Sequence, residues 1–374
     1  MKILVWCPNF NFGGGSRLFV NFVNALICNP KIKEVELIIP EYLFMHIENK
    51  INQEIKIYII KQYSENIIKF FDKPGKIFSI PGTGFLKRLI SEFLKKYLEI
   101  LERRKICKII KKSKGDIIYC FWPHFKNFIK TDKPVVCTIQ DTIMFEFPEI
   151  PGAYNINLER KRLLEWLNSS TRVIVSSEST KKNIYEYFGI FNNIYVVRHD
   201  AFPDNFENIN NQSDYSLPDK YIIYPGNITT HKNHYNLLIA WSKLLKKYNI
   251  PLVLIGEGTE IIGFDGDEYP LYYSWQELRL IGLIKRLGLK KNKHFYALGF
   301  IEDNLVLPLI KKAYALIMPS LSEGGGSYPV EEALTVGTPV LCSDIPVMRE
   351  HLKYRSAKIG WFDPLSIDSI VNSV

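Results

Sequence analysis

The chain has 374 residues and a net charge of +9, with 47% hydrophobic and 23% charged residues. This composition is typical of a folded globular protein and excludes a disordered chain, and the length predicts two domains rather than one. No stretch approaches the roughly 18 uninterrupted apolar residues that a membrane-spanning helix needs. The apolar run at the N-terminus is too short for a signal peptide, so we expect a cytoplasmic protein.

The six cysteines indicate the same compartment. They are Cys7, Cys28, Cys107, Cys120, Cys137 and Cys342. None is spaced as Cys-x-x-Cys, and most lie in apolar, strand-like runs. We therefore expect buried, reduced thiols rather than disulfides or a metal site.

Short apolar runs alternate with helical patterns along the first half of the chain. The runs are residues 3–7, 35–39, 55–60, 116–122, 135–139, 173–177 and 194–198. A polar, asparagine-rich stretch over residues 200–219 predicts a linker. The alternation restarts at residues 221–224, 251–255, 294–300, 315–318 and 339–343. Such alternation predicts parallel βαβ units, with an N-terminal domain over residues 1–200 and a C-terminal domain over residues 201–374.

Residues 85–114 are strongly basic. They hold eleven Lys or Arg against three Glu, a net charge of +8, and apolar residues recur among them at helical spacing. Two interpretations stay open: a helix packed on the core with a solvated basic face, or a helix that docks on an anionic membrane. Nucleic-acid binding is not expected, because no base-stacking pattern or known module accompanies the charge.

The most informative segment is residues 317–344, where an apolar run precedes a glycine loop and a helix that begins at a proline. Its polar and glycine positions are Glu323, Gly324, Gly325, Gly326, Ser327, Glu331 and Glu332. A strand, a glycine loop and a helix N-terminus make an anion site, because unpaired N–H groups and the helix dipole point at the ligand. Carboxylates beside it suit the hydroxyl pairs of a sugar. The segment therefore predicts a nucleotide-sugar site.

This segment resembles the retaining glycosyltransferases of family 4, which have the GT-B fold. Their signature is a Glu, seven residues and a second Glu at a helix start, then Ala and Gly-Thr-Pro, which Glu323, Glu332-Ala333 and Gly337-Thr338-Pro339 match. Glu331 lies eight positions after Glu323, as in the family pattern, whereas Glu332 has the family's position relative to Ala333 and Gly337. We favour Glu332, because a glycine loop absorbs an extra residue easily. Neighbouring helix positions point about 100° apart, so the two glutamates cannot face the donor equally.

The resemblance implies an α/β protein with two Rossmann-like, doubly wound parallel-sheet domains that face each other across a cleft. Weaker matches at residues 13–17, 173–181, 254–258 and 298–300 extend it over most of the chain. Relatives continue past the position of Val374 into a helix that crosses back to the first domain. We expect this helix to be missing, or the chain to be part of a longer polypeptide.

Lys232 is the predicted centre of the leaving-group site. In the family a cation, commonly Arg, and then a Lys hold the diphosphate between a strand and a helix. Lys232 matches the Lys, whereas Asn227 stands where the Arg is commonest. An ammonium beside a diphosphate stabilises the charge that develops on the leaving group. Gly226 and His231 are expected to line the same site.

Two further groups are expected near the reaction centre. Gly14 and Gly15, with Arg17, follow the first strand and allow close approach to a phosphate or an acceptor, although a tight turn would also explain the glycines. Gln140 and Asp141 end another strand, where many relatives have His-Asp. Gln140 is expected to bind a sugar hydroxyl, because Gln cannot act as a base. Asp141 is either part of the site or a turn residue.

The resemblance also implies roles for the helix and loop residues. Glu323 would bind donor-sugar hydroxyls, Glu332 the ribose diol, and the N–H groups of the glycine loop a phosphate or sugar. It implies a retaining mechanism in which a departing diphosphate oxygen removes the acceptor proton. No metal or other cofactor is expected, because basic residues and helix ends neutralise the diphosphate. Asp265-Gly266-Asp267 looks like the metal site of another glycosyltransferase fold but is expected to be a turn.

The first functional hypothesis is a retaining hexosyltransferase that uses a nucleotide-diphosphate sugar. Its acceptor would be a glycan or a lipid-linked glycan at the inner face of the cell membrane, in polysaccharide or glycolipid synthesis. The run at residues 231–234 is similar to some mannosyltransferases, a weak indication of the sugar. The alternative is a catalytically weak or inactive scaffold that binds sugar nucleotides, which Asn227, Gln140 and the shifted spacing favour. The base, the sugar, the acceptor and the linkage stay open.

Overall fold

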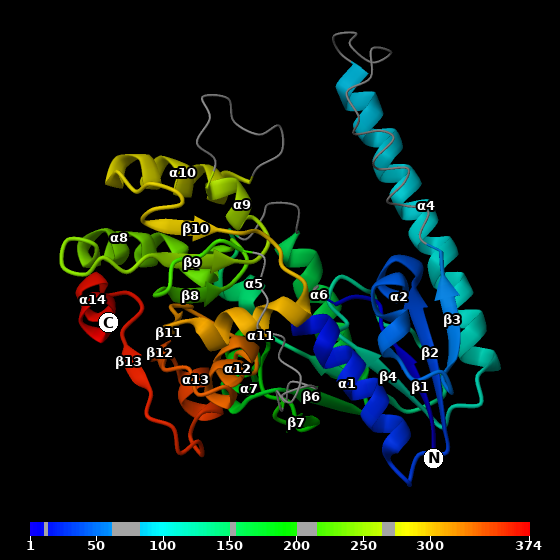
Figure 1. The fold of residues 1–374 in the computed structure, drawn as a ribbon. Coiled ribbons are helices and arrows are strands. Elements are labelled where there is room, and N and C mark those ends of the chain that lie inside the picture. The colour runs from blue at the N-terminus through cyan, green and yellow to red at the C-terminus, as the bar shows by residue number, and fades with distance from the viewer. Residues whose placement is uncertain (11–13, 62–82, 150–154, 200–214, 264–273) are drawn as a thin grey trace. The chain divides into compact units, whose positions relative to one another are not determined.

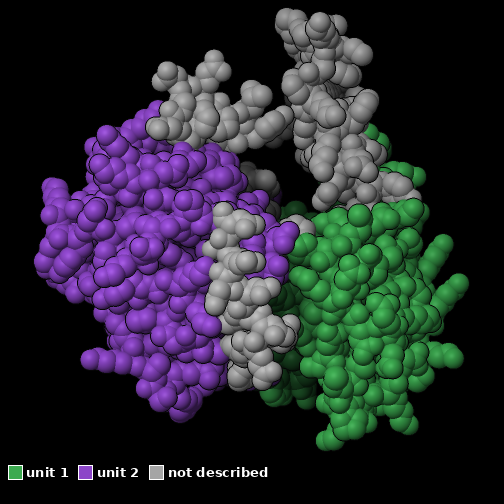
Figure 2. All heavy atoms as spheres, viewed as in Figure 1, with its two compact units in different colours: residues 1–139, 157–174, 191–195 green, residues 140–156, 175–190, 196–374 purple. Residues whose placement is uncertain are grey.

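The computed structural model describes residues 1–10, 14–61, 83–149, 155–199, 215–263 and 274–374. The chain forms two compact units, coloured separately in Figure 2. The first comprises residues 1–139, 157–174 and 191–195, and the second comprises residues 140–156, 175–190 and 196–374. Each unit contains one sheet, as Figure 1 shows. The domain boundary at residue 200 stays a prediction.

The first sheet has seven strands in the order β3-β2-β1-β4-β5-β6-β7. They are β1 (Lys2–Trp6), β2 (Glu34–Pro40), β3 (Lys56–Ile60), β4 (Ile117–Phe121), β5 (Val135–Ile139), β6 (Arg172–Val175) and β7 (Ile194–Val196). The register of β3, β2, β1, β4 and β5 is parallel throughout. The intervening helices are α1 (Gly14–Cys28), α2 (Glu41–Ile47), η1 (Glu48–Lys50), α4 (Thr83–Lys112), α5 (Ile143–Glu146), α6 (Ile156–Ser169) and α7 (Glu178–Phe188). All seven strands predicted for this half are confirmed.

The second sheet has six parallel strands in the order β10-β9-β8-β11-β12-β13. They are β8 (Ile222–Pro225), β9 (Leu252–Ile255), β10 (Phe295–Ala297), β11 (Ala315–Met318), β12 (Val340–Ser343) and β13 (Gly360–Phe362). The helices are η3 (Thr230–Lys232), α8 (His234–Leu244), α9 (Thr259–Ile262), α10 (Trp275–Leu287), α11 (Asp303–Lys312), α12 (Tyr328–Thr335), α13 (Pro346–His351) and α14 (Ile367–Ser373). Five of the six strands match the predicted ranges, and β13 was not predicted.

Both faces of the second sheet are covered, as the apolar strands require. Ile222 and Tyr224 of β8 belong to one buried cluster, with α8 and α10, while Tyr221 and Ile223 belong to another, with α11, α12 and α13. Successive strand residues point to opposite faces, so a strand buried on both sides is apolar throughout. The predicted class, two parallel-sheet α/β domains, is confirmed.

The order of each sheet reverses at one place. In the second sheet it reverses between β8 and β11, and in the first between β1 and β4. The loops that leave two such neighbouring strands diverge, and the space beyond the strand ends takes ligands in open α/β sheets. The loops after β8 and β11 are therefore where a site is expected in the second unit.

The cysteines are unpaired in the structure, as the sequence predicts. All six cysteines lie in the described residues and are free thiols; Cys7, Cys120, Cys137 and Cys342 are buried, and Cys28 is exposed. Within the described part of the chain, no helix has an apolar stretch that could cross a membrane.

Helix α4 confirms that the basic segment is helical. Its C-terminal half packs on the first unit through the buried Ile106 and Ile110, whereas Phe93 and Tyr97 are exposed further toward its N-terminus. Figure 1 shows that this N-terminal half extends beyond the end of β3. The helix thus has a core-packed half and a half with uncovered apolar side chains.

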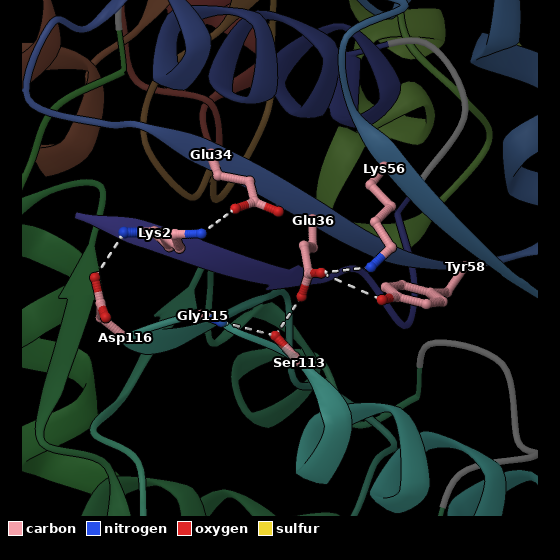
Figure 3. A network of polar contacts seen from close by, with 8 residues as sticks. All are labelled: Lys2, Glu34, Glu36, Lys56, Tyr58, Ser113, Gly115 and Asp116. Carbon is pink, nitrogen blue, oxygen red and sulfur yellow. Dashed lines mark hydrogen bonds and ion pairs between the residues drawn. The ribbon is translucent and has the colours of Figure 1, made fainter.

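A buried carboxylate ties α4 to the first sheet (Figure 3). Glu36 of β2 is 2% exposed and accepts hydrogen bonds from Lys56 Nζ (3.0 Å), Tyr58 Oη (3.2 Å) and Ser113 Oγ. Ser113 directly follows α4 and also accepts from the N–H of Gly115 at 3.0 Å. Burial would raise the pKa of Glu36, but the three donors outweigh it and hold the pKa below its usual value of 4.5. Removing the donors of such a buried carboxylate destabilises the fold, because its charge is then left uncompensated.

Replacing Glu36 by Gln should lower the free energy of opening of β2 by about 2 kcal/mol at neutral pH, because Lys56, Tyr58 and Ser113 lose a charged acceptor. The folded pKa lies below the unfolded value of 4.5, so this stabilisation is present above pH 4.5 and disappears as the pH falls through the folded value. Hydrogen exchange of peptides covering β2, measured from pH 7 to pH 3, tests both statements.

The neighbouring Glu34 provides the control, because it lies on the same strand and pairs with Lys2 at the surface. Glu34→Gln should change the opening free energy by less than about 1 kcal/mol. Equal effects of the two substitutions would contradict the role given to Glu36.

Candidate functional site

Lys232 and Glu323 meet where the loops after β8 and β11 diverge. Lys232 ends the short helix η3, seven residues after the end of β8 at Pro225, and Glu323 lies in the loop between β11 and α12. The Lys232 ammonium is 2.5 Å from Glu323 Oε1. The two side chains are 23% and 10% exposed, so the pair is accessible to a ligand. The sequence predicted both residues, and the structure brings them into direct contact.

Asn233 fixes the position of this lysine. It has a left-handed backbone conformation (φ 58°), which Asn adopts more readily than most residues. Its side-chain amide is buried and donates to the carbonyls of Pro319 (2.9 Å) and Pro364 (2.8 Å). The Tyr224 hydroxyl donates to the carbonyl of Lys232 at 2.8 Å. One residue thus joins the loops after β8, β11 and β13, and no local sequence pattern indicates its partners.

The two histidines beside Lys232 are neutral. Burial, with the nearby Lys232 charge, holds the pKa of His231 well below its usual value and lowers the pKa of His234 to about 3. His231 Nδ1 lies 3.2 Å from Thr229 Oγ1. Neither imidazole carries charge near neutral pH, so the positive charge of this turn is concentrated on Lys232.

The glycine loop packs tightly against the start of α7. The carbonyl of Gly324 accepts hydrogen bonds from Ser177 Oγ (2.9 Å) and Thr180 Oγ1 (2.7 Å). A Cβ on Gly325 would lie 2.3 Å from the Cβ of Ser176, and Gly326 has φ 124°, which side-chain-bearing residues rarely adopt. The predicted glycines are therefore required by close approach and by backbone conformation.

Gln140 lies against the same loop. Its Oε1 is 2.8 Å from His199 Nε2, and its carbonyl accepts from Ser176 Oγ at 3.1 Å. Burial, with the nearby His351, lowers the pKa of His199 to about 4, so the imidazole is neutral and donates to the amide oxygen. This orientation leaves Gln140 Nε2 as a buried donor with no hydrogen-bond partner among the described residues. A ligand hydroxyl would satisfy it.

Glu331 and Glu332, both in α12 and both buried, differ in their partners. Glu331 Oε1 lies 2.9 Å from His351 Nε2, and its Oε2 lies 3.0 Å from the Arg355 guanidinium. Burial would raise the pKa of Glu331, but His351 and Arg355 outweigh it and hold the pKa below its usual value. Glu331 is thus bound to α13 and the segment that follows it. Glu332 makes neither of these ion pairs.

Two carboxylates that sequence reasoning missed hold the surrounding loops. Glu146 of α5 accepts from Ser322 Oγ at 2.7 Å and from Asn183 Nδ2 at 2.8 Å. Glu350 of α13 accepts from the N–H groups of Glu178 (2.9 Å) and Ser179 (3.1 Å). The N-terminus of α7 is therefore occupied by a side chain of the protein. In the sequence, Ser177 as an N-cap residue and Glu178 in the first turn could mark that helix end, but no local signal points to Glu350.

The remaining predicted residues lie as follows. The Asn227 side-chain oxygen accepts from the N–H of Glu257 at 2.9 Å, and the N–H of Gly226 donates to Ile255 at 2.8 Å. Asp141 Oδ1 accepts from the N–H of Ile143 at 3.2 Å, as a turn residue does. Ser327 directly precedes α12. Gly14, Gly15 and Arg17 are in the first turn of α1, in the first unit.

No cluster of three or more His, Cys, Asp or Glu side chains suited to a metal ion occurs in the described ranges. Asp265, Gly266 and Asp267 lie outside the described residues. The prediction of a metal-independent site stays a prediction.

Known proteins resemble the chain most clearly in its second half. Residues 205–374 match the family model of glycosyl transferases group 1. The chain is 27% identical over 285 residues to an uncharacterized glycosyltransferase of Methanocaldococcus jannaschii, covering 72% of this chain and 67% of that protein. It is 26% identical over 224 residues to O-antigen chain mannosyltransferase B of Escherichia coli, covering 58% and 54%.

Solved structures show the same fold over the whole chain. The crystal structure of Anabaena Alr3699/HepE in complex with UDP and glucose superposes with a TM-score of 0.63 at 14% identity, covering 100% of this chain and 88% of that one. The two-domain GT-B glycosyltransferase fold, predicted from the sequence, is confirmed.

Proposed function

We propose that this protein is a retaining glycosyltransferase that moves a hexose from a nucleoside-diphosphate sugar to a glycan or lipid-linked glycan in polysaccharide synthesis. The observation that carries the proposal is the contact between Lys232 and Glu323 at the point where the order of the second sheet reverses. The name of the E. coli mannosyltransferase favours mannose as the sugar.

Lys232 and Glu323 have complementary tasks in this proposal. The ammonium would stabilise the diphosphate as it leaves, and the carboxylate would accept hydrogen bonds from hydroxyls of the donor sugar. In the structure each is the other's partner. A bound donor would offer a phosphate to the first and hydroxyls to the second, so both groups keep a partner of suitable charge or polarity.

Gln140 and Glu332 complete the donor site. The unpartnered Nε2 of Gln140 is a donor beside the glycine loop and suits a sugar hydroxyl. Glu331 is held by His351 and Arg355, which favours Glu332 as the carboxylate for the ribose diol. The N–H groups of the glycine loop, at the start of α12, would contact phosphate or sugar. Gly14, Gly15 and Arg17 would serve the acceptor or the leaving phosphate.

The proposed reaction needs no nucleophile from the protein. The bond between the anomeric carbon and the diphosphate oxygen breaks while the bond to the acceptor oxygen forms on the same face. The departing phosphate oxygen takes the proton of the acceptor hydroxyl, so the anomeric configuration is retained. No metal takes part, because Lys232 and the helix end oppose the phosphate charge.

Lys232→Ala should lower turnover at least about a hundredfold, because it removes the ammonium beside the leaving group. The measurement is release of nucleoside diphosphate from sugar nucleotides in the presence of a glycan acceptor, with EDTA present. The donor is first chosen by thermal shift against UDP, GDP and their sugar conjugates, since a bound nucleotide raises the apparent stability.

Lys243→Ala is the matched control, because Lys243 is an exposed lysine of α8 that pairs with Asp368 at the surface. It should leave turnover within about twofold of the parent protein. Near-normal turnover of Lys232→Ala would remove Lys232 from the mechanism. Nucleotide binding without release by the parent protein would instead favour the inactive scaffold.

Glu332→Gln should raise the KM for the donor about tenfold, because the diol loses a charged acceptor. Glu331→Gln should leave that KM unchanged and lower the free energy of unfolding by about 1–3 kcal/mol, since His351 and Arg355 lose their partner. Steady-state kinetics and chemical denaturation of the two variants measure this. The opposite assignment would give the KM effect to Glu331→Gln.

We also propose that α4 brings the enzyme to an anionic membrane. One face of the helix combines the exposed Phe93, Tyr97, Ile100 and Leu101 with the exposed Arg104, Lys108 and Lys111. These positions recur at intervals of three or four residues, which places them on one side of a helix. Apolar side chains that enter the lipid boundary and basic ones that meet its headgroups suit such a surface.

Reversing Arg104, Lys108 and Lys111 to Glu should weaken binding to anionic vesicles at least about a hundredfold, since each basic residue contributes about 1 kcal/mol. Vesicles of phosphatidylglycerol in a sedimentation assay provide the measurement. The same reversal at the exposed Lys246, Lys247 and Lys290 should have less than a tenth of the effect. If both triple variants bind like the parent protein, α4 is not a membrane contact.

A further inference from the structure

A cavity lies beside the Lys232 turn in the second unit. It has a volume of about 190 Å³ and is lined by residues of η3, the start of α8 and the first turn of α10. Its walls include Thr229, Thr230, Tyr235, Asn236, Trp275 and Arg279. The volume equals that of about six waters, which suits a single sugar ring. The donor site described above uses none of these six residues.

Trp275 and Arg279 form one wall of this cavity. They are one helical turn apart in α10, so their side chains lie on the same face of the helix. Trp275 is 45% exposed, a large fraction for an indole that ordinarily packs inside. The Arg279 guanidinium stacks 4.1 Å from the centre of the Tyr235 ring. This wall presents an aromatic face beside a planar, hydrogen-bonding cation.

The rest of the lining is neutral and polar. Gln276 Nε2 donates to Thr230 Oγ1 at 2.6 Å, and Asn236 Nδ2 donates to the carbonyl of Pro364 at 3.2 Å. These contacts hold both amides in place and leave their oxygens as acceptors. None of the residues that line the cavity is acidic, and no described carboxylate forms an ion pair with Arg279. The guanidinium donors are therefore directed to solvent or to a ligand.

The start of α10 does not favour an anion in this cavity. Ser274 caps the helix by accepting from the N–H of Glu277, and the Glu277 carboxylate accepts from the N–H of Ser274. The first turn thus has its own capping groups and a negative charge beside them. A phosphate would find a single cation, Arg279, among the residues that line the cavity, whereas a neutral ligand rich in hydroxyls can also use its amides and hydroxyls.

We propose that this cavity binds one saccharide unit, with its ring against Trp275 and its hydroxyls on Arg279, Asn236 and Gln276. An apolar sugar face suits an indole, and planar amide and guanidinium groups match pairs of neighbouring hydroxyls. The ligand class rests on the proposed function, in which the protein handles glycans. Thr230 lines the cavity and Lys232 ends the same short helix, so a glycan bound here lies next to the donor site.

Saturation-transfer NMR tests the proposal with methyl α-mannoside, methyl α-glucoside and an α-linked mannotriose as probes. The parent protein should show saturation transfer to at least one probe. Trp275→Ala and Arg279→Lys should each weaken it at least about tenfold, because one removes the aromatic face and the other the planar donor pair. Circular dichroism confirms that the variants fold.

The matched controls are Arg286→Ala, an exposed arginine of α10 outside the cavity, and Tyr314→Ala, an exposed aromatic residue before β11. Both should bind the probes like the parent protein. The inference is overturned if no probe binds, if the cavity variants bind as well as the controls, or if inorganic phosphate or uridine displaces the probe from the parent protein.

Nucleoside-diphosphate binding, followed by thermal shift in the same preparations, separates this inference from the proposed function. Trp275→Ala that loses the sugar and still binds the nucleotide supports both. If the parent protein binds no nucleotide, and Trp275→Ala loses the sugar binding that the parent protein shows, the proposed donor site is refuted and the saccharide site is retained.

Discussion

The side-chain amide of Asn233 is the constraint on which the site depends. It bonds to the carbonyls of Pro319 and Pro364 and so fixes η3 against the loops that follow β11 and β13. Both carbonyls and the amide are buried. Without these hydrogen bonds, the polar groups would have neither a protein partner nor water, which would destabilise the fold. The left-handed conformation of Asn233 turns the chain between η3 and α8. Lys232, the residue before it, therefore reaches Glu323 in one defined position.

The electrostatics of this turn favour exchange of one partner for another. His234 is buried, His231 is partly buried, and both are neutral, so Lys232 has no second cation beside it in η3 or at the start of α8. Its pair with Glu323 is partly exposed, and such pairs contribute on the order of 1 kcal/mol. A diphosphate carries more charge than one carboxylate and can offer two oxygens. In the proposed function, the pair would keep both side chains in place until a donor displaces it.

The sequence was a good guide to the sheets and a poorer guide to long-range contacts. Strands β8 and β11 are apolar on both faces, so their positions follow from composition alone. Strand β13 is three residues long and begins at a glycine, so composition does not reveal it. Lys232 and Glu323 were found because each follows a strand and precedes a helix. Glu350 was not, because its partners at Glu178 and Ser179 are more than 170 residues away along the chain. No local pattern encodes such a contact.

The glycine loop shows why spacing alone left two glutamates open. The interval from Glu323 to Glu332 is one residue longer than in the family pattern, and the loop must hold that residue while it passes close to α7 and α13. Gly325 has no room for a Cβ beside Ser176, and Gly326 adopts a φ of 124° next to the His351 ring. A backbone that takes such angles can lengthen the loop without turning α12. Glu331 then faces His351 and Arg355, and for this reason we propose Glu332 as the carboxylate of the donor site.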